Sequence, residues 1–75
     1  MKEDLTLDAR GLLCPLPVLK VQKRMRALPK GAVLTVLTDD PAAQIDVPHY
    51  CTESGNKLVE AVDHEGGHLF RIQKA

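Results

Sequence analysis

Aromatic residues are scarce in this 75-residue chain, which contains one Tyr, one Phe and no Trp. Proteins that bind single-stranded nucleic acid stack bases on aromatic rings, so the scarcity disfavours that class. Charge disfavours it too, because ten basic and ten acidic residues leave a formal net charge of zero. Binding to nucleic acid or to an anionic membrane normally requires a basic excess. With so few rings, we expect Leu and Val to fill the core.

Long apolar runs are absent and cysteines are few. No run approaches the roughly 20 apolar residues that cross a bilayer, and residues 1–4 lack the apolar segment of a secretion signal. We therefore expect a single domain over residues 1–75, located in the cytoplasm. Cys14 and Cys51 are too few for a disulfide scaffold. We expect two free thiols, and a bridge between them is the minor alternative.

Hydrophobic spacing predicts six secondary-structure elements. Alternation with period two favours a strand near the N-terminus, and a β-branched apolar run is typical of a strand at the centre of a sheet. One helical face is marked by 3-4-3 spacing of Val18, Val21, Met25 and Leu28. The predicted strands are 5–9, 32–38, 57–62 and 69–74, and the predicted helices are 15–28 and 41–54.

Prolines and Asp residues predict how the second helix begins and bends. Asp40 followed by Pro41 is typical of an N-cap and a first helical residue. Pro48 cannot donate the hydrogen bond that a helix interior needs. We therefore expect a kinked or two-part helix that ends at Gly55.

The order βαβαββ predicts an α/β two-layer sandwich. Strand–helix–strand units favour parallel pairing with right-handed crossovers, and the last two strands favour an antiparallel hairpin. The economical arrangement is a four-stranded mixed sheet with two helices packed on one face. The other face is then left to solvent or to a partner.

Cys14 is the residue whose context indicates reactivity. A thiol at a helix N-cap faces the positive end of the helix dipole and free backbone N–H groups, which favour a thiolate. Pro15 and Pro17 carry no N–H, so only the Leu16 amide remains to face the sulfur in the first turn. We therefore expect a modestly activated thiol. From spacing alone, a buried structural cysteine that happens to precede a helix is the more common case.

A longer motif surrounds this cysteine. The stretch 7–17 resembles the signature D-x-x-G-x-x-C-P-x-P of the TusA (SirA-like) family of sulfur carriers. The matching residues are Asp8, Gly11, Cys14, Pro15 and Pro17. The resemblance continues through 39–42, 46–48 and 50–52, so it covers almost the whole chain. It implies the same two-layer fold that the spacing predicts.

The resemblance also implies an activity. Cys14 would accept sulfane sulfur as a persulfide from a cysteine desulfurase or rhodanese-like donor and pass it to a downstream acceptor protein. This is sulfurtransferase activity in the carrier sense, without a cofactor. The expected pathway is 2-thiolation of the wobble uridine in transfer RNA; sulfur oxidation and molybdenum cofactor synthesis are alternatives. Leu16 stands where some thiolation members carry an acidic residue, which leaves the acceptor open.

Two further residues match positions of the family. Asp46 stands at a position implicated in docking to the relay partner, and a helix cap beside Pro48 is an equal alternative. Cys51 matches a second cysteine of many members. We expect it to pack against Ile45, Val47 and Tyr50, and a resolving thiol is the lesser alternative.

Basic residues crowd the first predicted helix. They include Lys20, Lys23 and Arg24, with Arg10 and Arg26 nearby. They form either a docking surface for an acidic donor or an ordinary solvated face. The three His residues do not have the spacing of a metal site. Two rival functions stay open: a redox-sensing thiol protein, and an RNA-binding module that uses the basic helix.

Overall fold

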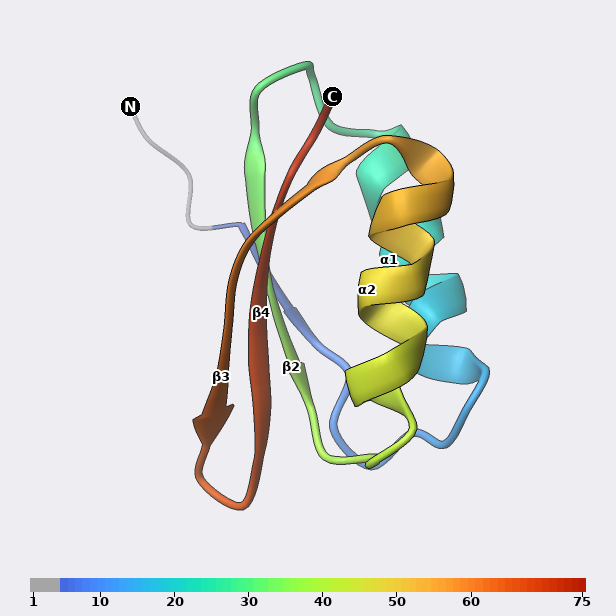
Figure 1. The fold of residues 1–75 in the computed structure, drawn as a ribbon, viewed down its shortest axis with the longest axis vertical. Helices are drawn as coiled ribbons and strands as arrows, with labels where there is room; N and C mark the ends of the chain where they lie inside the picture. The colour runs from blue at the N-terminus through green and yellow to red at the C-terminus, as the bar shows by residue number, and fades with distance from the viewer. Residues whose placement is uncertain (1–4) are drawn as a thin grey trace.

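The computed structural model describes residues 5–75, so the expectation for residues 1–4 lies outside it. The elements are β1 (Thr6–Asp8), α1 (Leu16–Arg26), β2 (Val33–Thr38), α2 (Ala43–Ser54), β3 (Lys57–His64) and β4 (Gly67–Gln73). Both helices lie on one side of a four-stranded sheet (Figure 1). The predicted α/β two-layer sandwich is therefore confirmed. Within residues 5–75, no helix is long and apolar enough to cross a membrane.

The sheet has the strand order β1-β2-β4-β3. The nearly continuous apolar run of β2 lies inside the sheet, parallel to β1 on one side and antiparallel to β4 on the other. Val36 is paired with Leu7 and with Phe70. The β3–β4 hairpin turns through Glu65 and Gly66, whose φ angles of 48° and 80° are those of a type I′ turn.

The core lies between the inner face of the sheet and the two helices. Val21 and Met25 of α1 are buried, and Val18 and Leu28 pack at its edge, so the predicted apolar face of this helix is confirmed. The other buried apolar side chains that form the core are Leu7, Leu34, Val36, Ala43, Val47, Cys51, Phe70 and Ile72. Leu and Val make up half of these ten positions, as the scarcity of aromatic residues led us to expect.

Both helices begin later than predicted. The N-cap residue of α1 is Pro15 and that of α2 is Ala42, and neither has a side-chain cap. The two-part alternative for the second helix is wrong, because α2 runs as one helix through Pro48 and ends at Gly55; a kink at Pro48 stays a prediction. Pro48 removes one N–H donor, but Val47 and Cys51 on either side are buried against the sheet. Their burial holds the two halves of the helix together.

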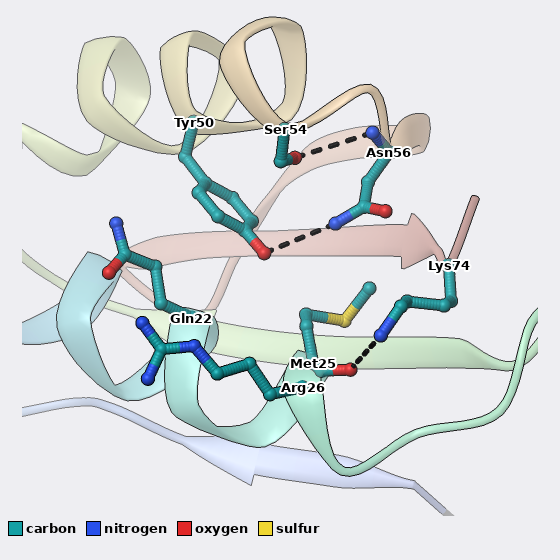
Figure 2. A pocket seen from close by; sticks show the side chains of 7 residues that line it. All are labelled: Gln22, Met25, Arg26, Tyr50, Ser54, Asn56 and Lys74. Carbon is teal, nitrogen blue, oxygen red and sulfur yellow. Dashed lines mark hydrogen bonds between the residues drawn. The ribbon is translucent and has the colours of Figure 1, made fainter.

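The end of β4 is tied to the end of α1. The Lys74 ammonium donates to the Met25 carbonyl oxygen at 2.7 Å, near the C-terminal end of the helix, where the same oxygen also accepts from the Leu28 N–H at 3.1 Å. Figure 2 shows this contact beneath the hydrogen bond, 3.1 Å long, between the Asn56 amide and the Tyr50 hydroxyl. The residue that follows β4 therefore fixes the C-terminal end of α1.

The outer face of the sheet is left uncovered by the helices. Leu37, Leu69 and Val62 form a row across β2, β4 and β3. Arg71 and Glu60 pair beside this row at 2.7 Å. This face is therefore partly apolar and open, in agreement with the expectation that the chain lacks material to cover it.

Candidate functional site

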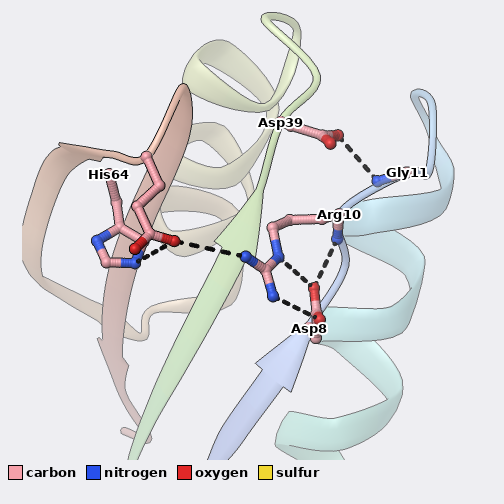
Figure 3. A network of polar contacts seen from close by, with 6 residues as sticks. Asp8, Arg10, Gly11, Asp39 and His64 are labelled. Carbon is pink, nitrogen blue, oxygen red and sulfur yellow. Dashed lines mark hydrogen bonds and ion pairs between the residues drawn. The ribbon is translucent and has the colours of Figure 1, made fainter.

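The loop between β1 and α1 begins with a local ion pair. The Arg10 guanidinium Nε lies 2.9 Å from Asp8 Oδ1, and the Arg10 backbone N–H donates to the same oxygen (Figure 3). These hydrogen bonds lower the pKa of Asp8 to about 2. Gly11 follows with a φ of 82°, which a residue with a side chain adopts only with strain. Asp8 and Gly11 therefore shape the turn that leads to Cys14.

Two carboxylates at the end of β2 hold this loop in place. Asp39 Oδ1 accepts a hydrogen bond from the Gly11 N–H at 2.9 Å. Asp40 Oδ2 accepts one from the Cys14 N–H at 2.6 Å, and its Oδ1 accepts one from Ala42 at 3.1 Å. Sequence reasoning assigned the Asp residues only to the start of the helix. The parallel pairing of β1 and β2 could have indicated this contact, since it brings the ends of the two strands together.

Cys14 is exposed, but it is not the helix cap. It lies one residue before the N-cap Pro15, across a cis peptide bond. The Leu16 N–H donates to the Leu13 carbonyl oxygen at 2.8 Å and is not available to the sulfur. Pro17 is buried at the start of α1. The predicted activation of Cys14 by the end of the helix is therefore wrong.

Asp46 contacts the thiol directly. Cys14 Sγ donates a hydrogen bond to Asp46 Oδ2 at 2.7 Å, and the two residues are 32 positions apart in the chain. This hydrogen bond raises the pKa of Cys14, as do partial desolvation and the negative charges of Asp46 and Asp40. The cap alternative for Asp46 is wrong, because the residue lies in the first turn of α2 and α2 has no side-chain cap. No pattern in the sequence pointed to this pair.

The thiol opens on a groove between the two helices. The groove has a volume of about 420 Å³. Its α1 side is formed by the uncharged residues Val18 and Gln22, with Pro15 at the start of the helix. Its α2 side is formed by Asp46, His49, Tyr50 and Glu53. Carboxylates therefore face the thiol from α2, and no Lys or Arg lines the groove.

The basic residues of α1 lie elsewhere. Lys20, Lys23 and Arg24 are exposed and line a separate depression with Leu7 of β1. Arg26 lines the pocket of Figure 2, beside Gln22. The structure thus does not bring the predicted docking residues Lys20, Lys23 and Arg24 together with Asp46 and Cys14 in one groove.

Exposed apolar residues flank the thiol, and sequence reasoning missed them. Leu13 is 70% exposed, Leu16 is 48% exposed and Ile45, next to Asp46, is 75% exposed. The expected packing of Ile45 around Cys51 is therefore wrong. Leu16 falls off the 3-4-3 apolar face of α1, which was a usable signal.

Cys51 is a second free thiol in a different environment. It is 4% exposed and belongs to the core, as predicted. Burial raises the pKa of its thiol, so it is a poor nucleophile in the folded protein. Among residues 5–75, no group of three His, Cys, Asp or Glu side chains is arranged to hold a metal ion.

Comparison with known proteins places this chain in a family. The family model described as Sulfurtransferase TusA matches residues 5–74. The Sulfur carrier protein TusA of Pseudomonas entomophila (strain L48) is 41% identical over 71 residues, covering 95% of this chain and 89% of that protein. Its namesake from Pseudomonas fluorescens (strain SBW25) is 39% identical over 74 residues, 99% of this chain and 89% of that protein.

A solved structure agrees with the sequence matches. A SirA-like protein from Desulfitobacterium hafniense is 28% identical and has a TM-score of 0.79, covering 95% of this chain and 96% of that one. The sequence matches and the structural match therefore both extend over almost the whole chain. This chain belongs to the TusA family of sulfur carriers.

Proposed function

We propose that the chain carries sulfane sulfur as a persulfide on Cys14. The observation that supports this most strongly is an exposed thiol on a loop pinned by Asp39 and Asp40, in a member of a sulfur carrier family. A carrier thiol must be accessible to two proteins in turn, and a fixed loop presents it to both in the same place. Cys51 is buried and does not serve this role.

The transfer step is an exchange between two sulfur atoms. The Cys14 sulfur attacks the terminal sulfur of a donor persulfide; a new S–S bond forms at Cys14, and the donor S–S bond breaks. The donor leaves as a thiolate and takes up the proton that Cys14 lost. A thiol and a persulfide have exchanged places, so no oxidant or reductant is consumed.

The donor is a cysteine desulfurase or a rhodanese-like protein in the cytoplasm, and the acceptor is a downstream relay protein. The pathway we propose ends in 2-thiolation of the wobble uridine of transfer RNA. Sulfur oxidation and molybdenum cofactor synthesis are the alternative destinations, because Leu16 departs from the acidic residue of some thiolation members. Which acceptor protein takes sulfur from the loaded chain decides among them.

Loading distinguishes this function from redox sensing. After incubation with a desulfurase and cysteine, the protein should gain about 32 Da, and a thiol reductant should reverse the gain. Cys14→Ser should abolish loading with the fold intact, and Cys51→Ser should load nearly normally. A gain of about 16 Da without a sulfur donor would instead indicate oxidation of Cys14 as the physiological event. Equal loss of loading in both variants would overturn the assignment of Cys14.

Donor docking on the basic side of α1 is part of the proposal. Lys20, Lys23 and Arg24 are exposed, and within residues 5–75 none has an ion-pair partner. Free positive charges steer an acidic partner and raise the association rate more than the affinity. We place docking of the relay acceptor at Asp46, on the groove side of the helices.

Charge reversal tests the docking surface. Lys23→Glu with Arg24→Glu should slow sulfur transfer from the donor several-fold at low salt, and less at high salt, because ions screen exposed charges over about 8 Å at physiological salt. Reversal of Lys30 and Lys57, which are exposed outside α1, is the matched control. Transfer at the parental rate in the Lys23 and Arg24 variant would show that the basic face is only solvated.

A further inference from the structure

The contact between Cys14 and Asp46 requires a proton. Asp46 Oδ2 and Cys14 Sγ are 2.7 Å apart, and both groups would repel each other if both were anionic. The other ionisable groups around the thiol are Asp40, from the loop before α2, and His49, Tyr50 and Glu53 of α2 itself. The α1 side contributes no charged side chain to the groove. The site therefore favours a neutral sulfur over an anionic one.

A persulfide differs from a thiol in this respect. Its S–H bond is weaker and its terminal sulfur spreads negative charge over two atoms, so a persulfide is a stronger acid than its parent thiol. The loaded side chain is therefore anionic at neutral pH. Its Sγ is bonded to carbon and to sulfur and has no proton to donate to Asp46.

We propose that Asp46 discriminates between the empty and the loaded carrier: its carboxylate holds the Cys14 thiol in the groove and repels the persulfide anion out of it. The inference rests on the proposed persulfide function and deepens it. Asp46 acts as a switch because the same carboxylate is a hydrogen-bond acceptor for one form and a like charge for the other.

Loading ends this contact. As Cys14 Sγ attacks the terminal sulfur of the donor, the S–H group that donates to Asp46 Oδ2 is lost, and its proton passes to the departing donor thiolate. The terminal sulfur now bonded to Cys14 is anionic and turns toward the exposed rim of Leu13 and Ile45, where an acceptor meets it.

The first experiment measures the empty thiol, and it does not depend on sulfur transfer. Alkylation of Cys14 by iodoacetamide is followed against pH by peptide mass spectrometry in the parent, Asp46→Asn and Glu53→Gln. Glu53→Gln removes the same charge from the same groove without a hydrogen bond to the sulfur. Near neutral pH, Asp46→Asn should react about fivefold faster than the parent, on the scale of one unit charge about 4 Å away in water. The pH profile should move to lower pH in this variant, while Glu53→Gln should stay close to the parent.

The second experiment measures the loaded sulfur. The same three proteins are loaded with a cysteine desulfurase and cysteine, and alkylation of the persulfide is measured. Asp46→Asn should change the persulfide rate less than about twofold, because the anion has left the carboxylate. Thermal melts exclude unfolding, and Asp46→Ser is the second variant if Asp46→Asn is unstable.

The outcomes separate the two proposals. A thiol profile unchanged in Asp46→Asn, or equal effects on thiol and persulfide, refutes the switch and leaves the carrier function standing. Failure of every protein to load, with the thiol profiles shifted as expected, refutes the carrier function instead. A large thiol effect with a small persulfide effect supports the switch.

Discussion

Removing the Asp40 side chain should release the loop that presents Cys14. Asp40 is the link between the thiol loop and the start of α2, because its two oxygens accept from Cys14 at 2.6 Å and from Ala42 at 3.1 Å. Asp40→Ala removes both acceptors at once. The neighbouring contact from Gly11 to Asp39 remains in place, so only one end of the loop is freed.

The size of the effect follows from the two hydrogen bonds. A bond to a charged acceptor stabilises by about 1.5–3 kcal/mol and an ordinary one by about 1 kcal/mol. Both amides can hydrate once the carboxylate is gone, so the low end applies. We expect the free energy of unfolding to fall by about 3 kcal/mol, because both bonds go to the charged carboxylate; this corresponds to roughly 12–24 °C in Tm for a domain of this size.

Hydrogen exchange and thermal melts test this prediction together. In Asp40→Ala the Cys14 amide should lose its protection while the Gly11 amide keeps it. Asp63→Ala is the matched control. The Asp63 side chain is 94% exposed, and its ion pair with His68 is long, with 3.8 Å between Asp63 Oδ1 and His68 Nε2. Equal losses of Tm in the two variants, or an unchanged Cys14 amide, would show that Asp40 does not hold the loop.

Three other expected outcomes concern the frame around the site. In an NMR titration Asp8 should have a pKa of about 2, and Arg10→Ala should raise it; because the folded-state pKa is lowered, this stabilisation is present above about pH 4 and is lost as pH falls toward 2. Gly67→Ala should destabilise by about 3 kcal/mol or more, because its Cβ would overlap the backbone of β2, whereas Gly66→Ala should cost only about 1 kcal/mol of backbone strain; urea melts with equal losses would contradict this. Cys51 should resist iodoacetamide until the protein unfolds, since it is buried, and labelling as fast as that of Cys14 would refute its place in the core.

Local patterns predicted the fold because they determine each element separately. The apolar run of β2 and the spacing of Val21 and Met25 each report burial on one face, and the structure confirms both. The predicted two-part helix did not form at Pro48. The missing N–H of this proline disfavours the helix locally, but burial of Val47 and Cys51 outweighs that cost. Tertiary packing therefore determines the length of this helix, and such packing cannot be deduced from a short stretch of neighbouring residues.

The candidate site was harder to predict than the fold. The motif located Cys14 and the turn before it, but the prediction of a modestly activated thiol rested on the proline pattern, which placed Cys14 at the cap of α1. Leu16 instead donates to Leu13, and the partner of the sulfur is Asp46, 32 residues away. Contacts between residues so far apart in the sequence depend on how β1 and β2 align and on where α2 begins. Such alignment is a property of the folded sheet and has no local signature.

The edges of the sheet bear on how this protein can associate with others. One edge strand, β1, is only three residues long, and the other, β3, is irregular between Leu58 and Glu60. Short or bulged edges are poor templates for an added strand from a second chain. Such edges protect against fibrous aggregation through strand addition. The edges therefore favour association through side chains over association through an added strand.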